Sequence, residues 1–325
     1  METVVIRLIT DKPVKKTAYQ VKGVFMKHYS NSIVIPMLDG SYRDKFLYPR
    51  VQVKILNEQI YVVGIREGAE PVRALAKELT LLNFGNITFE VVDVDMEESE
   101  NRFQHINQLL RYKFVSPWVA LGNTTQNRYK FLKNADRVAF LNKLLGQNIV
   151  FLGREMDVDL SEKVYTKIRL SSLFPKPVDE DNWGAFTGEF HTNFILPDYI
   201  GIGNGITRGY GAIHGLYHPD EILINDEKTN NSDDSDSIAA LLESDESIQF
   251  VKVTSVPKPR RKSKNKKNKK SKLKKAQPDK IKLDKNRSKT SKNKPEKQVK
   301  QNFSDQPEED NNFNTAEYHK KQHSI

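Results

Sequence analysis

All of the periodic apolar segments in this chain lie before residue 220. Beyond that point, residues 220–251 carry ten acidic side chains against one basic, and residues 252–300 carry 22 basic side chains against three acidic. Segments of this composition bury too little apolar area to offset the ordering entropy, which is about 1–2 kcal/mol per residue. The sequence therefore predicts a folded part over residues 1–219 and a disordered tail, first acidic and then rich in lysine, over residues 220–325.

Residues 1–96 alternate between patterns typical of strands and of helices. Short apolar or alternating runs predict four strands, over residues 4–9, 46–56, 59–65 and 86–95. Apolar residues at spacings of three and four predict two helices, over residues 17–29 and 68–83. The order strand, helix, strand, strand, helix, strand is that of a ferredoxin-like domain.

A polar run over residues 97–101 is interpreted as a linker to a second domain over residues 102–219. This domain is predicted to contain a long helix over residues 126–150 and strands over residues 103–118, 163–172, 185–196 and 212–217. Where a second helix would complete the ferredoxin-like order, the chain has a glycine-rich segment. The predicted fold class is therefore α+β, with two tandem ferredoxin-like domains, a glycine-rich loop near the end of the second domain, and a disordered tail.

Six of the 16 glycines fall within this glycine-rich segment, residues 201–215. Their spacing fits neither of two common nucleotide-binding loops, G-x-G-x-x-G and G-x-x-x-x-G-K-[ST]. Glycine reaches positive φ without strain, and several glycines together can present N–H groups to phosphate oxygens. Arg208 can add a charge-assisted contact. The alternative is an ordinary glycine-rich turn between two strands.

Three stretches of the chain resemble one family. They are FLYPRVQVKI and YVVGIREGAE within residues 46–70, YKFVSPWVALGNTTQNRYKFL over residues 112–132, and FTGEFHTNFILPDYIGIGNGITRGYGAI over residues 186–213. Over roughly residues 1–217 the sequence is similar to the RAMP superfamily of CRISPR-associated RNA-binding proteins. Within that superfamily it resembles the endoribonucleases that process CRISPR repeat RNA.

The resemblance implies that the chain cleaves CRISPR repeat RNA without a metal or another cofactor. In that reaction a 2′-hydroxyl attacks the adjacent phosphate and leaves a cyclic phosphate, which requires a base, an acid and support for the phosphate. The resemblance also implies that the glycine-rich segment binds the RNA. The residues expected to do so are Gly201, Gly203, Gly205, Arg208, Gly209, Gly211 and His214.

His28 is the expected base, because it is the only histidine of the first domain and imidazole titrates near neutral pH. Related sequences often carry a pair of histidines just before the strand expected at residue 46, where this chain has MLDGSYRDKF and no histidine. Tyr42, Lys45 and Tyr48 bracket this region and complete the expected catalytic set by supplying a proton or a charge. For each of these residues, a solvated or packing role is the alternative.

Other features indicate where the protein acts and leave two further functions open. The chain has no cysteine, no apolar start long enough for a signal peptide, and no apolar run long enough to cross a membrane. We therefore expect a cytoplasmic protein without a membrane partner. The open alternatives are an RNA-binding subunit of an effector ribonucleoprotein complex that has lost cleavage, and a general nucleic-acid-binding protein driven by the Lys-rich tail.

Overall fold

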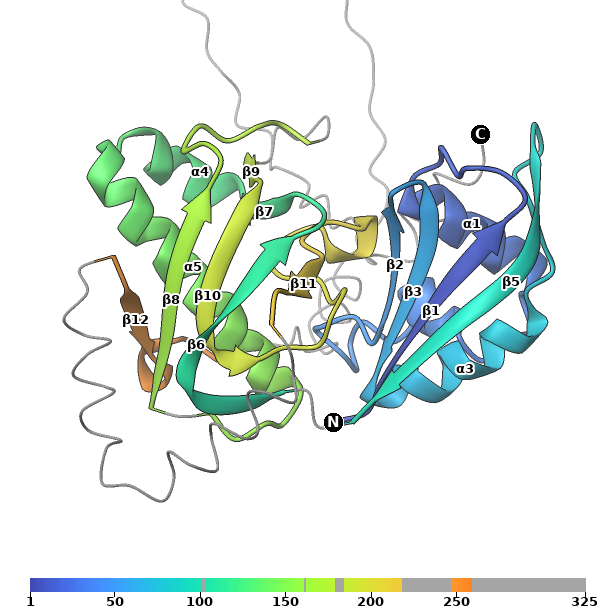
Figure 1. Ribbon diagram of the computed structural model, residues 1–325, viewed down its shortest axis with the longest axis horizontal. Helices are drawn as coiled ribbons and strands as arrows, with labels where there is room; N and C mark the ends of the chain where they lie inside the picture. Colours follow the sequence, from blue (N-terminus) through green and yellow to red (C-terminus); the bar gives the residue numbers. More distant parts are fainter. Residues whose placement is uncertain (101–102, 161, 179–183, 218–246, 259–325) are drawn as a thin grey trace, which may run out of the picture. The chain divides into compact units, whose positions relative to one another are not determined.

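The computed structural model describes residues 1–100, 103–160, 162–178, 184–217 and 247–258. These residues belong to one compact unit that contains two domains, each built around a five-stranded antiparallel sheet (Figure 1). Most of the acidic stretch and nearly all of the Lys-rich stretch lie outside the described residues, so their disorder stays a prediction.

The N-terminal domain has the predicted ferredoxin-like order. Its strands are β1 (Thr3–Thr10), β2 (Val51–Leu56), β3 (Gln59–Ile65), β4 (Leu81–Asn83) and β5 (Thr88–Ser99). They form a sheet in the order β2-β3-β1-β5-β4, in which β2 is an edge strand. The helices are α1 (Ala18–His28), α2 (Ile35–Leu38) and α3 (Ala69–Glu78), with the 3-10 turn η1 (Arg66–Gly68) before α3.

Helix α1 begins where the sequence provides a capping box. The Thr17 hydroxyl accepts from the Gln20 N–H at 3.2 Å, and the Gln20 side chain accepts from the Thr17 N–H at 2.9 Å. These two bonds satisfy amides that the helix itself leaves without an acceptor. The apolar sides of α1 and α3 then pack on the same face of the sheet (Figure 1). This packing fixes the first turn of α1, which contacts the glycine-rich segment.

The C-terminal domain repeats the ferredoxin-like order without its second helix. Its strands are β6 (Gln104–Phe114), β7 (Trp118–Leu121), β8 (Lys163–Leu170), β9 (Gly184–Phe186), β10 (Gly188–Ile195), β11 (Ile213–Gly215) and β12 (Gln249–Lys252). The main sheet has the order β11-β6-β10-β8-β12, and β7 pairs with β9 in a separate two-stranded sheet. Its helices are α4 (Asn123–Lys130) and α5 (Asn134–Glu155), and the glycine-rich segment contains the 3-10 turn η2 (Ile206–Arg208). None of the described helices is long and apolar enough to cross a membrane.

The predicted α+β class with two ferredoxin-like domains is confirmed, but four local expectations are wrong. The helix predicted over residues 68–83 ends at Glu78, because Leu81–Asn83 form strand β4 and pair with β5. Residues 97–99 are not a linker, because they continue β5 and pair with β1. The helix predicted over residues 126–150 is interrupted, since α4 ends at Lys130 and α5 begins at Asn134. The second strand begins at Val51 rather than at residue 46, because Pro49 lacks the N–H that a strand ladder needs.

The C-terminal domain also extends beyond the boundary predicted at residue 219. Strand β12 pairs antiparallel with β8 and adds an edge to the main sheet. Val251 on β12 is 3% exposed and lies so close to Gly146 of α5 that a Cβ on the glycine would come within 2.7 Å of it. Arg154 of α5 fixes the next residues by donating to the carbonyls of Val253 and Val256, at 2.7 Å each. This segment is therefore part of the fold.

The two domains share a continuous core, and their common boundary positions the candidate site. Val5, Val63 and Ile65, on the sheet face of the N-terminal domain opposite α1 and α3, pack together with apolar residues of the C-terminal domain. At one end of this boundary the buried guanidinium of Arg50 donates to the Glu155 carbonyl at 2.6 Å. Because Arg50 directly precedes β2, this bond holds the start of the strand against the second domain.

Candidate functional site

The glycine-rich segment forms a closed loop that lies along strand β2. Gly201 and Ala212 form the antiparallel bridge that closes the loop. Gln52 accepts from the Gly201 N–H at 2.8 Å, and Lys54 Nζ donates to the Tyr210 carbonyl at 3.1 Å. Because Gln52 and Lys54 belong to β2, the N-terminal domain fixes the position of a loop that belongs to the C-terminal domain.

Two glycines of the loop are required by close packing at positive φ. Gly203 has a φ of 94°, and a Cβ there would lie 2.8 Å from Trp118 Nε1 and 2.8 Å from the Val119 carbonyl oxygen. Gly209 has a φ of 95°, and a Cβ there would lie 2.9 Å from the Cβ of Ala18 in α1. A side chain at either position would therefore strain the fold itself, besides any effect on a ligand.

The loop tip is the part that can offer amides to a ligand. The N–H groups of Gly201, Gly209 and Gly211 all donate to acceptors within the protein. In the described part of the chain, the N–H groups of Gly203 and Gly205 have no acceptor, and they flank the exposed Asn204. The amides available to phosphate oxygens are thus those of the tip, whereas the other three glycines have a structural role.

Two buried lysines lie beside this loop. Lys54 is fully buried and Lys22 of α1 is 3% exposed. Burial, and then the charge of Lys22, lower the pKa of Lys54 to about 7. Burial, and then the charge of Arg208, lower the pKa of Lys22 to about 8. No carboxylate among the described residues offsets either shift, so this pair of cations favours an anion nearby.

Both lysines stand out in the sequence by their apolar neighbours, although neither is among the residues expected from the sequence. Lys22 lies four residues after Ala18 and three before Phe25, so it falls on the apolar, buried side of α1. Lys54 lies within the short apolar strand VQVKIL. A lysine on an apolar helix face or inside an apolar strand is uncommon, because lysine is almost never fully buried without a partner.

The structure places His28 away from the loop. It is the exposed last residue of α1 and lies six residues beyond Lys22, which is about 9 Å along the helix axis. The start of α1 contacts the loop at Gly209, whereas its end lies beside β4, where the Tyr29 hydroxyl donates to the Leu81 carbonyl at 2.9 Å. No contact within the described residues joins the His28 side chain to the loop.

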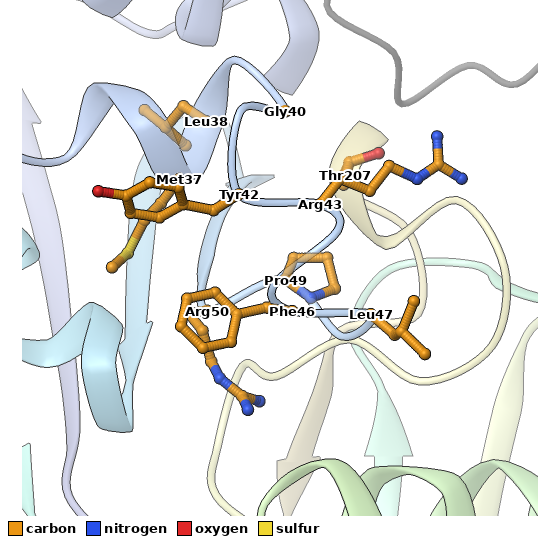
Figure 2. A pocket seen from close by; sticks show the side chains of 10 residues that line it. All are labelled: Met37, Leu38, Gly40, Tyr42, Arg43, Phe46, Leu47, Pro49, Arg50 and Thr207. Carbon is orange, nitrogen blue, oxygen red and sulfur yellow. The ribbon is translucent and has the colours of Figure 1, made fainter. Parts of the chain in front are cut away.

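The other expected catalytic residues lie in the segment that leads into β2, and one of them, Tyr42, lines the pocket shown in Figure 2. Tyr42 and Thr207 of the loop both line this pocket, with the Tyr42 hydroxyl on the side opposite Thr207. Lys45 Nζ lies 5.1 Å from the centroid of the Tyr42 ring. Tyr48 is buried, and its hydroxyl donates to the Gly201 carbonyl at 2.7 Å, so that it fastens the loop. Of the four expected catalytic side chains, the described residues thus bring only Tyr42 and Lys45 into contact.

The two charged or titratable side chains expected to bind RNA differ in their placement. His214 Nδ1 lies 3.2 Å from an Asp198 oxygen, and the histidine ring stacks on Tyr199. The hydrogen bond to the Asp198 carboxylate raises the pKa of His214. Arg208 is half-buried in η2, and its charge acts on Lys22. Arg208 therefore forms a basic cluster at the loop together with Lys22 and Lys54, whereas His214 does not belong to this cluster.

The geometry combines two amides at the loop tip, Arg208, and the buried pair Lys22 and Lys54. Within the described ranges, no group of three or more His, Asp or Glu side chains is placed to hold a metal ion. The described groups at this loop are therefore suited to bind an anion, and a phosphate of a nucleic-acid backbone fits them.

Comparison with known proteins agrees with this architecture. The sequence-family model of the Cas6b N-terminal domain matches residues 1–102, and that of the Cas6b C-terminal domain matches residues 104–216. A solved structure titled "Crystal structure of Cas6b" is 26% identical with a TM-score of 0.57, and the match covers 66% of this chain and all of that one. A second, "Crystal structure of CRISPR RNA processing endoribonuclease Cas6b", is 24% identical with a TM-score of 0.50 and the same coverage, and supports the fold alone.

A relative from Methanocaldococcus jannaschii, named "Uncharacterized protein MJ0978", is 29% identical over 132 residues, which are 41% of this chain and 90% of the relative. Two ferredoxin-like domains and a glycine-rich loop in the second define the class, a CRISPR-associated protein with a RAMP-like fold. Because the two Cas6b models together match almost all of residues 1–216, the chain belongs to the Cas6b family of CRISPR-associated endoribonucleases. The predicted family is confirmed.

Proposed function

We propose that the chain binds CRISPR repeat RNA at the glycine-rich loop and cleaves it without a metal, by attack of a 2′-hydroxyl on the adjacent phosphate. The observation that carries the RNA-binding step is the buried pair Lys22 and Lys54 beside a loop tip with two available amides. Such contacts hold an RNA backbone in place without reading its sequence.

The two lysines act on a bound phosphate mainly through their charge, because both side chains are buried. At an effective dielectric constant of about 20, a unit charge about 7 Å from a phosphate contributes roughly 2 kcal/mol, which corresponds to about 30-fold in affinity. Arg208 at the same loop is better exposed and supplies the direct, charge-assisted contact.

His28 is the proposed general base. Its distance from the loop determines how far the phosphate held by the loop lies from the cleaved bond. A base must lie within hydrogen-bond reach of the hydroxyl that it deprotonates, or be linked to it through one water. His28 is about 9 Å along α1 from Lys22, which is two to three stacked nucleotides at about 3.4 Å each. The loop therefore holds a phosphate near the cleaved bond, and the cleaved bond itself lies toward the end of α1.

This assignment is tested by single-turnover cleavage of a CRISPR repeat RNA in EDTA, with binding measured separately. His28→Ala is expected to slow cleavage by about 10²- to 10⁴-fold and to change affinity only a few fold, because a base acts on the transition state. Lys54→Met is expected to weaken binding about 30-fold while the rate at saturating protein changes less. Lys77→Met, an exposed lysine of α3, is the matched control and leaves both unchanged.

The product distinguishes the proposed reaction from its alternatives. The parent protein should leave a 2′,3′-cyclic phosphate and a 5′-hydroxyl. Cleavage that persists in His28→Ala would move the base to another residue. The second candidate function is RNA binding without cleavage, and the observation that favours it is that no contact within the described residues joins the His28 side chain to the loop. Binding of repeat RNA by the parent without any cleavage would establish that function.

A further inference from the structure

Two exposed phenylalanines lie close to the start of α5, Phe131 between α4 and α5 and Phe174 in the segment after β8. Phe131 is 89% exposed and Phe174 is 70% exposed, which makes them the two most exposed large apolar side chains of the described residues. A single exposed apolar side chain is common on protein surfaces and needs no explanation. Two phenylalanines of this exposure call for one, since Phe174 is linked to Tyr129 through Arg137 and Phe131 follows Tyr129 by two residues in the sequence.

Phe174 is the outer member of a stack that the protein already holds in place. The guanidinium carbon of Arg137 lies 5.5 Å from the centroid of the Phe174 ring and 5.2 Å from that of the Tyr129 ring. Tyr129 is buried, and its hydroxyl donates to the carbonyl of Leu173, the residue before Phe174, at 2.7 Å. Phe131 follows two residues after Tyr129, at the end of α4. A flat ligand can therefore extend the stack at little cost in side-chain entropy.

The charge around these rings fits a nucleic-acid strand. Residues 123–143 carry five basic side chains and one acidic side chain, and Lys130 and Lys133 lie on either side of Phe131 in the sequence. Aromatic rings among cations are the usual means of binding single-stranded RNA, because bases stack on the rings while the cations attract the backbone. The same charge disfavours a second copy of this chain as the partner, since like charges would meet.

Helix α4 leads from the glycine-rich loop to these rings. At the loop tip, Asn204 Nδ2 donates to the Val119 carbonyl at 3.2 Å, a few residues before α4 begins. The eight residues of α4 span about 12 Å. An RNA strand that leaves the loop tip along α4 reaches the rings within about three or four stacked nucleotides.

We propose that Phe131 and Phe174 form a stacking platform for unpaired bases of the RNA held at the glycine-rich loop, an inference that rests on the proposed function for the identity of the RNA. The platform adds affinity without sequence preference, because every base has a face that can stack. It takes no part in the cleavage step, from which it is separated by the loop and α4.

The test uses the full chain and two labelled probes of about ten nucleotides, an oligoadenylate and a ribose-phosphate strand of the same length without bases. The parent should bind the oligoadenylate more tightly. The double variant Phe131→Ala/Phe174→Ala should lose at least about fivefold in affinity for the oligoadenylate and keep its affinity for the strand without bases. Phe250→Ala is the matched control, because Phe250 is 44% exposed and has Lys163 Nζ 5.0 Å from its ring centroid. This control should bind both probes as the parent does.

The platform would be overturned if the double variant and the Phe250→Ala control lost affinity for the oligoadenylate equally, or if neither lost any. A double variant whose mass in solution changes while its RNA affinity does not would overturn it in favour of contact between copies of the chain. Cleavage of repeat RNA by the parent is measured apart from these probes. A parent that stacks oligoadenylate on the platform but cuts no repeat RNA would contradict the proposed cleavage and leave the platform supported.

Discussion

At the scale of single residues, the buried lysines link folding stability to RNA binding. A lysine with a pKa near 7 in the folded protein and of 10.5 in the unfolded chain is charged at neutral pH only at the expense of folding free energy. A phosphate bound close by favours the charged form, so that binding recovers part of this loss. Lys54 therefore opposes folding in the free protein and supports the complex.

Replacing Lys54 by methionine is expected to stabilise the free protein at neutral and lower pH. Between the folded pKa of about 7 and the unfolded pKa of 10.5, the unfolded chain binds more protons than the native state. The free energy of unfolding of the parent therefore increases as the pH rises through this window. Below this pH window, the buried charge of Lys54 destabilises the parent to its full extent. Lys54→Met is then expected to raise the free energy of unfolding by on the order of 3 kcal/mol, after subtraction of the lost bond to the Tyr210 carbonyl.

Urea unfolding of the parent and of Lys54→Met at about pH 6 and about pH 10 measures this difference. The two proteins should differ most at the lower pH and converge at the higher one. Lys77→Met provides the control for loss of a surface lysine. If Lys54→Met were less stable than the parent at low pH, the charge of Lys54 would be stabilised by its contacts and would not oppose folding.

At the scale of secondary-structure elements, most of the fold could be predicted because long elements repeat their pattern. In α3, for example, Val72 and Leu75 recur at helical spacing and are buried as predicted. The prediction failed at β12, because Val251 alone turns inward in a four-residue strand that joins an acidic run to a basic one. For the basic cluster, the sequence indicates a buried lysine at Lys54 within an apolar strand, but its contact with the loop arises from tertiary packing, which local sequence patterns do not contain.

Two truncations test whether β12 stabilises the C-terminal domain. A chain that ends at residue 258 should melt at the same temperature as the full chain, because the sequence after it offers few apolar residues to a core. A chain that ends at Asp220 loses the buried Val251 and Val256 and the carbonyls that Arg154 holds, so we expect a loss of about 2–4 kcal/mol. Differential scanning calorimetry compares the two, and equal melting temperatures would contradict a stabilising role of β12.

At the scale of the whole molecule, the candidate site exists only because both domains are folded and joined. The loop belongs to the C-terminal domain, whereas Lys22 and Lys54 belong to the N-terminal domain. Their common boundary is a continuous buried core, to which Tyr48 adds a buried hydrogen bond with the loop. Cooperative unfolding of the two domains follows from such a core, because separating them would expose apolar surface on both sides.

This coupling predicts that damage to one domain lowers the stability of the other. Leu8 is fully buried in the N-terminal core, away from the C-terminal domain, so Leu8→Ala should cost about 2–5 kcal/mol and lower the melting temperature by ~5–15 °C. Trp118 is fully buried in the core of the C-terminal domain, so tryptophan fluorescence measured in a Trp183→Phe background reports on that domain. The fluorescence midpoint should shift together with the circular dichroism midpoint. Tryptophan fluorescence that keeps the parental midpoint, while circular dichroism shows an earlier phase, would mean that the domains unfold independently.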